Sequence, residues 1–207
     1  MLYKFILDGF LTDGSWAMWI IMFLFFGGIG LIIERIWYLF LKCGAGSNVF
    51  MGSIAKFLKA GEYEKATKFA SQHATPLAKA VVAILQCRGK GAKATQKAVD
   101  EVFLTEAPKV TRNIPLIPML GNLATLMGLM GTIFGLMMAF DAIANVPAAQ
   151  RAQALATGIS VAMSSTLWGL LVAVPLLLVH GILVAKSDGV LQELDEKATK
   201  FINMVEA

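Results

Sequence analysis

Two long uncharged runs, residues 113–140 and 152–185, constrain the fold of this chain more than any other feature. A run of about 18 or more apolar residues without a charge is typical of a transmembrane helix. As helices the two runs would be roughly 42 and 51 Å long, whereas the hydrocarbon core of a bilayer is ~30 Å thick. We therefore expect two spans that tilt or project beyond the bilayer, joined by a link at residues 141–151.

A third apolar run and the overall composition complete the expected set of spans. Of the 207 residues, 57% are hydrophobic and 15% are charged, against about 25% charged in soluble domains. Residues 14–41 are predicted to form the first transmembrane helix, with aromatic residues near both ends that suit membrane interfaces. Residues 1–13 fit an amphipathic segment lying in the interface, and an overhang of the first helix explains them equally well.

Glu34 and Arg35 end the uncharged part of the first span and mark its membrane edge. Neighbouring residues point about 100° apart on a helix, so we do not expect these two side chains to pair with each other. Either they bond to other helices or they lie at the level of the lipid headgroups. We favour the headgroup position.

Residues 42–112 form the one sizeable polar region, with 12 Lys and Arg against five Asp and Glu. Glycine- and proline-containing breaks divide it into four predicted helices, at 49–58, 62–70, 76–87 and from 93 to about 109. The tail, 186–207, keeps a helical spacing of apolar residues and should continue the third span. The pattern predicts an all-α integral membrane protein with three transmembrane helices, a helical cytoplasmic domain, and long second and third helices that extend into the cytosol.

The basic residues predict the orientation of the chain. The region 42–112 and the tail together hold 15 of the 18 Lys and Arg. The positive-inside rule then places both segments in the cytosol, with the N-terminus and the link 141–151 outside. Because the basic residues are gathered in these segments, the net charge of +4 is not a signal for nucleic acid. The partner expected from the apolar runs is the lipid bilayer.

The sequence offers little for catalysis or metal binding. Cys43 and Cys87 follow no ligand or disulfide pattern and are expected to be inert, reduced thiols. His73 sits at a predicted helix break beside Pro76, where we expect a surface-loop histidine rather than a ligand or base. We find no HExxH motif, no nucleophile–base pair and no intramembrane pair of carboxylates. We therefore expect no catalytic residue, no metal, no cofactor and no enzymatic activity.

Small and hydroxylic residues distinguish the two long runs from helices that merely face lipid. Small residues at helical spacing let helices approach closely, and those expected to do so are Gly128, Gly131, Gly135, Gly169 and Ala173. The polar residues Asn122, Thr125 and Thr132 fall near one side of the second span, and Ser164 belongs to a similar series in the third. Two interpretations stay open. Either each hydroxyl bonds back to a carbonyl of its own helix, or the polar residues line a narrow wet path.

Thr132 and Thr166 have corresponding positions in the two spans. Thr132 lies 20 residues from Arg112, and Thr166 lies 20 residues from Lys186. Both charges mark the same end of antiparallel helices, so the two hydroxyls should lie at similar depths. A threonine hydroxyl relays hydrogen bonds but carries no charge near neutral pH, and the runs hold no Asp, Glu, Lys or Arg. If protons cross here, the carboxylate must come from another subunit, such as a single-span partner with one membrane aspartate.

The motifs of both spans resemble a known family. The segment Leu126-Met-Gly-Leu-Met-Gly-Thr-Ile-Phe-Gly135 resembles the second-helix motif of the MotA/TolQ/ExbB proton-channel family. Gly169-Leu170 and Ala173-Val-Pro175, together with Gly158-Ile159, resemble its third-helix motif, and Glu34-Arg35 is similar to the end of its first helix. The three-span layout is similar to the TolQ and ExbB type rather than to the four-span MotA type.

This resemblance implies a homopentamer around an ExbD/TolR-like single-span partner in the bacterial inner membrane. Proton flow past the partner's membrane aspartate would then drive mechanical work on the cell envelope. By position, Thr132 and Thr166 match the family's pore-facing threonines, and the further candidates for the pore lining are Thr125, Asn122 and Ser164. Val161 stands where TolQ and ExbB carry a glutamate, which leaves the partner's aspartate as the expected sole proton carrier. The competing hypothesis is a non-conducting membrane scaffold that uses the small residues only for packing.

Overall fold

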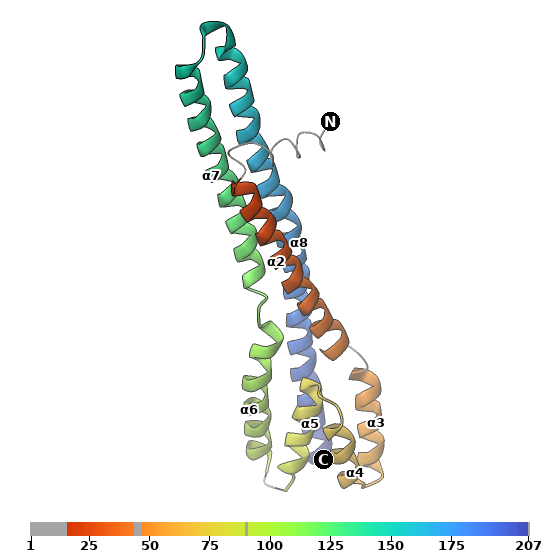
Figure 1. Cartoon of the computed structure of the whole chain (residues 1–207). Coiled ribbons are helices and arrows are strands. Elements are labelled where there is room, and N and C mark those ends of the chain that lie inside the picture. Colours follow the sequence, from red (N-terminus) through yellow and green to blue (C-terminus); the bar gives the residue numbers. More distant parts are fainter. Residues whose placement is uncertain (1–15, 44–46, 90, 207) are drawn as a thin grey trace. The chain divides into compact units, whose positions relative to one another are not determined.

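The computed structural model describes residues 16–43, 47–89 and 91–206 (Figure 1). Its helices, in chain order, are α2 (Trp16–Ile36), η1 (Trp37–Cys43), α3 (Ser47–Lys59), α4 (Tyr63–Ser71), α5 (Pro76–Gln86), α6 (Ala92–Thr111), α7 (Leu116–Asn145), η2 (Ala148–Gln150) and α8 (Arg151–Glu206). No strand occurs within these ranges, and three of their helical stretches are long and apolar enough to cross a membrane. The predicted all-α fold with three candidate spans is therefore confirmed. The amphipathic segment predicted at residues 1–13 lies outside the described residues.

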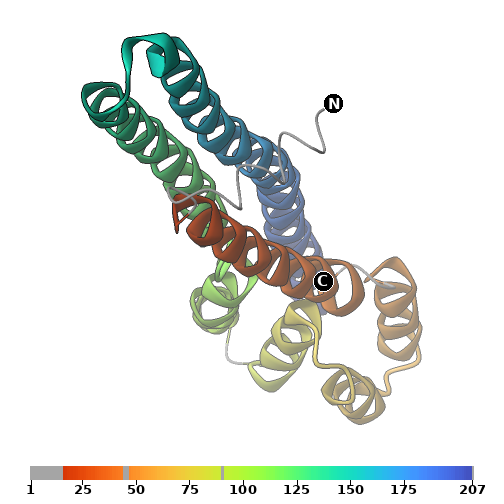
Figure 2. The ribbon, with the colours of Figure 1, turned by 45° about the horizontal axis from the view of Figure 1, so that its top comes forward.

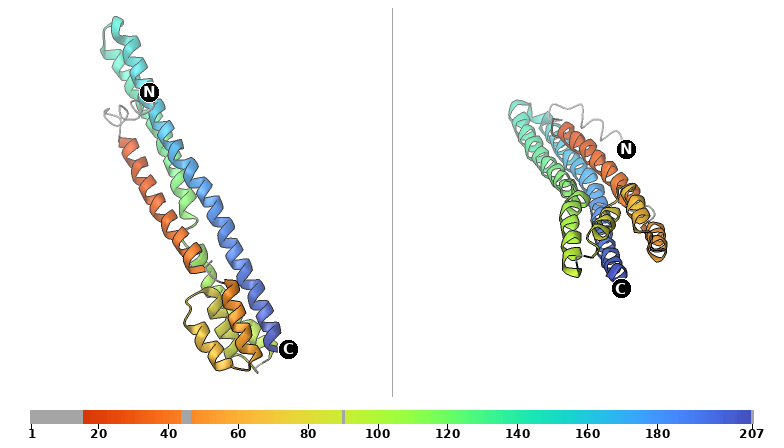
Figure 3. Two further views of the ribbon diagram at one scale, coloured as in Figure 1. Left: turned by 90° about the vertical axis from the view of Figure 1, so that its right-hand side faces the viewer. Right: turned by 90° about the horizontal axis from the view of Figure 1, so that it is seen from below.

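The chain forms two compact units. Unit 1 contains residues up to Ile33 and Asn113–Gly181, and unit 2 contains Glu34–Arg112 and Ile182–Ala207. The helices α2 and α8 each contribute residues to both units. Figure 3 shows α8 as one uninterrupted helix, so the tail continues the third span as its apolar spacing predicts.

In unit 1, α7 and the first half of α8 form an antiparallel hairpin, with α2 beside it (Figure 2). The connection is shorter than the predicted link 141–151, because α7 continues to Asn145. Asn145 Nδ2 donates a hydrogen bond to the Asp141 carbonyl, at 3.1 Å. Val146 is extended, with φ −109° and ψ 153°, as expected of a residue before proline, and Pro147 then excludes further helix.

In unit 2, α3 to α6 form a helical cluster with the end of α8. The four helices agree with those predicted from the sequence. Two of the three breaks between them contain glycines with positive φ, Gly61 in the first and Gly89 and Gly91 in the third. The apolar core includes Phe50 of α3, Val81 and Ile84 of α5, and Phe201 of α8. The amphipathic tail is therefore part of the core of this unit.

Candidate functional site

A seam of small residues joins α7 to α8 in unit 1. Its buried members on α7 are Gly121, Ala124, Gly128, Gly131, Gly135 and Ala139. On α8, Ala162, Ser165, Gly169 and Ala173 are buried opposite them. A Cβ on Gly128 would lie 2.9 Å from the Ser165 carbonyl oxygen, and one on Gly169 would lie 2.7 Å from the Ala124 oxygen. The backbones approach so closely that the five residues predicted for helix packing all lie in this seam.

Two hydroxyls of α8 reach across the seam to one carbonyl of α7. Ser165 Oγ, 4% exposed as a residue, lies 3.1 Å from the Gly128 oxygen and 2.8 Å from the oxygen of Ala162 in its own helix. Thr166 Oγ1 donates to the same Gly128 oxygen at 3.4 Å. Gly128 precedes Thr132 by about one helical turn. The register of the hairpin thus places Thr132 and Thr166 within about one turn of each other.

The other candidate hydroxyls bond within their own helices. Thr125 Oγ1 donates to the Gly121 oxygen at 3.2 Å, and Thr132 Oγ1 donates to the Leu129 oxygen at 2.6 Å. Ser164 Oγ donates to the Ser160 oxygen at 2.9 Å. These bonds saturate the hydroxyl hydrogens, while each oxygen keeps lone pairs that can accept a further bond.

Thr132 and Thr166 lie on the same side of the α7–α8 pair. Each follows a seam residue directly, Gly131 in α7 and Ser165 in α8. One step forward turns by about 100°, and in antiparallel helices that face each other this step leads to the same side of the pair. Both threonines are half-buried at the edge of the seam.

The helix α2 covers the opposite side of the pair. A Cβ on Gly131 would lie 3.3 Å from Ala17 Cβ, and the rings of Trp16 and Phe134 meet edge to face with centroids 5.9 Å apart. Further along, Gly28 faces Leu176 of α8. On the threonine side, by contrast, Leu129 is 54% exposed and Leu170 is 45% exposed. Among the described residues of unit 1, none covers the side that carries Thr132 and Thr166.

The structure does not bring all five predicted pore-lining residues together. Thr125 and Asn122 are exposed. Thr125 lies on nearly the same side of α7 as Thr132, and Asn122 lies about 80° around the helix from Thr132. Ser164 is only 3% exposed and precedes Thr166 by two residues, about 200° around α8. Ser164 therefore lies on a different face of α8 from Thr166.

Sequence reasoning missed Ser165, whose hydroxyl is buried in the seam. The series Gly158, Ala162, Ser165, Gly169 and Ala173, at steps of four, three, four and four, is the signal that could have found it. The sequence analysis singled out Ser164 and Thr166 instead, and the structure places Thr166 beside the seam.

Residues 69–196, more than half of the chain, match the MotA/TolQ/ExbB proton channel family. The chain belongs to this family. The matched range includes the whole α7–α8 hairpin and both threonines.

Curated relatives of this chain carry ExbB names. A biopolymer transport protein ExbB homolog of Methanothermobacter thermautotrophicus is 24% identical over 164 residues, 79% of this chain and 57% of that protein. An ExbB-like 3 protein of Synechocystis is 28% identical over 151 residues, 72% of this chain and 71% of that protein. The biopolymer transport protein ExbB of Helicobacter pylori is 32% identical over 96 residues, 46% of this chain and 65% of that protein. The matches thus span less than two thirds of the first and third of these relatives.

The Glu34–Arg35 pair at the end of α2 differs from the sequence expectation. Arg35 is 3% exposed, and its guanidinium pairs with the Glu34 carboxylate, so the prediction that the two do not pair is wrong. The reason is the length of the Arg35 side chain, whose guanidinium reaches the Glu34 carboxylate while its Cζ lies 5.0 Å from the Tyr38 ring centroid. Arg35 Nη1 also donates to the Lys109 carbonyl in the last turn of α6, at 3.2 Å. Arg35 therefore bonds to another helix, the interpretation that we did not favour.

Glu106, one turn before Lys109, forms a second polar junction in unit 2. Its side chain is 4% exposed and accepts hydrogen bonds from Lys79 at 2.9 Å and from Lys109 at 2.7 Å. Burial acts to raise the pKa of Glu106, but the hydrogen bonds and charges of Lys109 and Lys79 outweigh it and hold the pKa below its usual value. The ion pair links α5 to α6 near the point where α6 ends.

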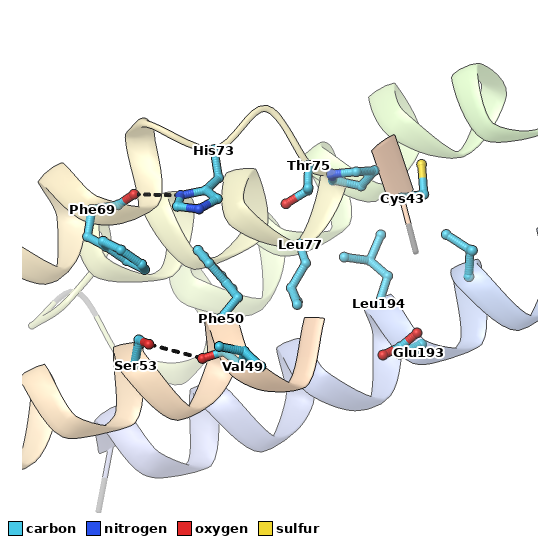
Figure 4. Close-up of a pocket in the computed structure, with 12 residues that line it drawn as sticks. Cys43, Val49, Phe50, Ser53, Phe69, His73, Thr75, Leu77, Glu193 and Leu194 are labelled. Atoms are coloured by element: carbon cyan, nitrogen blue, oxygen red, sulfur yellow. Dashed lines mark hydrogen bonds between the residues drawn. The ribbon is translucent and has the colours of Figure 1, made fainter. Parts of the chain in front are cut away.

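A cavity of about 210 Å³ in unit 2 contains the predicted loop histidine (Figure 4). His73 Nδ1 lies 3.1 Å from the Phe69 carbonyl oxygen, and its ring packs against Phe50 and Phe69. Cys43 lines the same cavity. Within the described ranges, no three His, Cys, Asp or Glu side chains are placed to hold a metal ion.

Proposed function

We propose that this chain is the proton-channel subunit of a complex that uses the proton-motive force to do mechanical work on the cell envelope. The main observation in support of this proposal is that Thr132 and Thr166 share the side of the α7–α8 pair that α2 leaves uncovered. In an assembled complex this side would face a central axis. Membership of the proton channel family supports the same reading.

The chain's own side chains would supply a hydrogen-bonding wall rather than the proton carrier. No Asp, Glu, Lys or Arg occurs in 113–140 or 152–185. Val161, half-buried on α8, adds no carboxylate at the position where the TolQ and ExbB type carries one. We therefore infer an ExbD/TolR-like single-span partner whose membrane aspartate takes up and releases the proton. Hydroxyl oxygens with free lone pairs would accept hydrogen bonds from water or from the protonated aspartate.

The proposed pore lining consists of Thr132, Thr166, Thr125 and Asn122. Ser164 is left out because it lies on another face of α8 and is buried within the single chain. A homopentamer around the partner would place five copies of this pore-lining face around one central pore. The charge distribution supports a bacterial inner-membrane location, with the N-terminus periplasmic and unit 2 in the cytosol. The proposal includes no enzymatic activity and no cofactor.

Reconstitution with the partner in liposomes that contain a pH-sensitive dye tests the proposal. The double variant Thr132→Val, Thr166→Val keeps the shape of both side chains and removes only the hydroxyls, so we expect loss of proton flux with the oligomer intact. Thr157→Val is the matched control. Thr157 bonds to the Gln153 carbonyl at 3.0 Å and lies about 180° around α8 from Thr166. Wild-type flux in the double variant would refute the proposed role of the threonines.

A non-conducting scaffold is the alternative, and one observation favours it. The hydroxyls of Thr125, Thr132 and Ser164 all have acceptors in their own helices, as they would if the hairpin served only for packing. A wild-type complex with its partner that passes no protons across the liposome membrane would support the scaffold. Flux that depends on the partner's aspartate would exclude it.

A further inference from the structure

Two lysines at the ends of the apolar helices stand against aromatic rings instead of carboxylates. Lys186 Nζ lies 5.3 Å from the ring centroid of Phe40, and Lys42 Nζ lies 5.7 Å from that of Tyr38. Neither lysine has a carboxylate within salt-bridge distance among the described residues. A ring holds an ammonium group in place by cation–π attraction but leaves its charge uncompensated.

Other lysines of α8 have acidic residues at helical spacing, whereas Lys186 has none. Lys197 and Lys200 each pair with a glutamate one turn earlier, Glu193 and Glu196. The positions three and four residues from Lys186 are occupied by apolar residues or glycine: Ile182, Leu183, Gly189 and Val190. Asp188 is two residues from Lys186, about 200° around the helix, and no ion pair between the two is formed in the structure.

The surface beside Lys186 is apolar on the side toward the uncharged run. Ile182, one turn before Lys186, is 63% exposed. Phe40 is 48% exposed, and Ile36, one turn before it, is 41% exposed. The contact between Lys186 and Phe40 thus places a fixed cation at the end of two exposed apolar helix faces, all within unit 2.

We propose that Lys186 on Phe40, with Lys42 on Tyr38 as a second cation, binds the headgroups of anionic phospholipids. The phosphate would take the place of the missing carboxylate, and the acyl chains would cover Ile36 and Ile182. The ammonium groups keep hydrogen-bond donors for phosphate oxygens because no carboxylate occupies them. A zwitterionic headgroup presents its own cation beside the phosphate and offers less net attraction.

Lipid titration followed by native mass spectrometry tests this inference. The full-chain oligomer is stripped of lipid in detergent and titrated with phosphatidylglycerol or with phosphatidylcholine of the same acyl chains. We expect preferential binding of phosphatidylglycerol. The double variant Lys42→Gln, Lys186→Gln should lose that preference, with affinity falling roughly fivefold per lysine, as expected for single basic residues at an anionic surface.

Two controls separate a defined site from net charge. The double variant Lys197→Gln, Lys200→Gln removes the same charge from paired lysines of α8 and should bind phosphatidylglycerol like the wild type. Phe40→Leu keeps every charge but removes the ring that holds Lys186, and it should weaken binding. Lys186→Arg should retain it. Equal binding of the two lipids, equal loss in both double variants, or unchanged binding in Phe40→Leu would overturn the proposal.

Discussion

Thr166 of α8 donates a hydrogen bond to the carbonyl of Gly128 in α7, at 3.4 Å, across a seam of glycine, alanine and serine residues. This contact fixes the register of the hairpin and sets Thr166 about one turn from Thr132. A residue proposed for the pore lining and a packing residue therefore stand next to each other in α8, as Thr166 and Ser165 do.

Gly169→Ala should destabilise the hairpin. The added Cβ would lie 2.7 Å from the Ala124 carbonyl oxygen, a backbone atom that cannot move aside without shifting α7. Overpacking of this kind costs about 1–3 kcal/mol. Gly30→Ala in α2, where nothing lies within 4 Å of the new Cβ, is the control and should be neutral. Thermal unfolding of the detergent-solubilised protein measures both, and equal melting temperatures would contradict the close approach seen here.

Ser165→Ala should weaken the seam without opening it. The variant removes a buried hydroxyl that has acceptors in both helices, so we expect a loss of roughly 0.5–1.5 kcal/mol in unfolding free energy. Ser165→Leu should disrupt the hairpin altogether, because its branched side chain would meet the Gly131 backbone. The two variants compared in one unfolding series show whether Ser165 packs as described. If Ser165→Leu is as stable as the wild type, Ser165 does not lie in the seam.

Glu106→Gln should lower the stability of unit 2 at neutral pH by roughly 1–3 kcal/mol, because two lysines lose a charged, buried acceptor. The lowered pKa of Glu106 means that its ion pairs stabilise the fold above the unfolded-state pKa. That contribution is lost as the pH falls through the lower, folded-state value. Wild type and variant should therefore converge in acid. The exposed Glu101→Gln is the control, and a stability gap that persists unchanged into strong acid would contradict the pairing.

Arg35→Lys should also be destabilising although it keeps the charge. The planar guanidinium donates to the Glu34 carboxylate and to the Lys109 carbonyl at once. The single ammonium group of lysine cannot reproduce this geometry. We expect a loss of about 1–2 kcal/mol, the size of one hydrogen bond from a charged donor. Hydrogen exchange at the end of α6 should rise in the variant. Unchanged exchange there would show that Arg35 does not cap this helix.

The sequence predicted what depends on local pattern. Apolar length indicated the three spans, and Gly61, Gly89 and Gly91 marked breaks because their positive φ ends helices. The prediction ended the second span at Phe140 because Asp141 is charged, but a charged residue does not stop a helix outside the hydrocarbon core. The helix ends only at Asn145, two residues before Pro147.

Local pattern could not predict the partners of a long side chain, nor which of two adjacent small residues enters the seam. The angle between Glu34 and Arg35 on the helix suggested no pairing, but side-chain length overrode it once Arg35 was buried against Tyr38. Ser165 and Thr166 are both small and hydroxylic, and only the register against α7 decides which one enters the seam. Ser164 looked equivalent to Thr166 by residue type, and the same register turns it to another face.

Water access to Thr132 and Thr166 in the assembled complex is the most direct measurement of the proposed pore. In a background with Cys43→Ser and Cys87→Ser, single variants Thr132→Cys and Thr166→Cys are treated in membranes with a charged, water-soluble thiol reagent. Phe23→Cys, on the exposed face of α2, is the lipid-facing control. We predict modification at both threonine positions and none at Phe23. Two threonine positions that stay as unreactive as Phe23 in a complex that still conducts protons would contradict a water-filled path along this side of the hairpin.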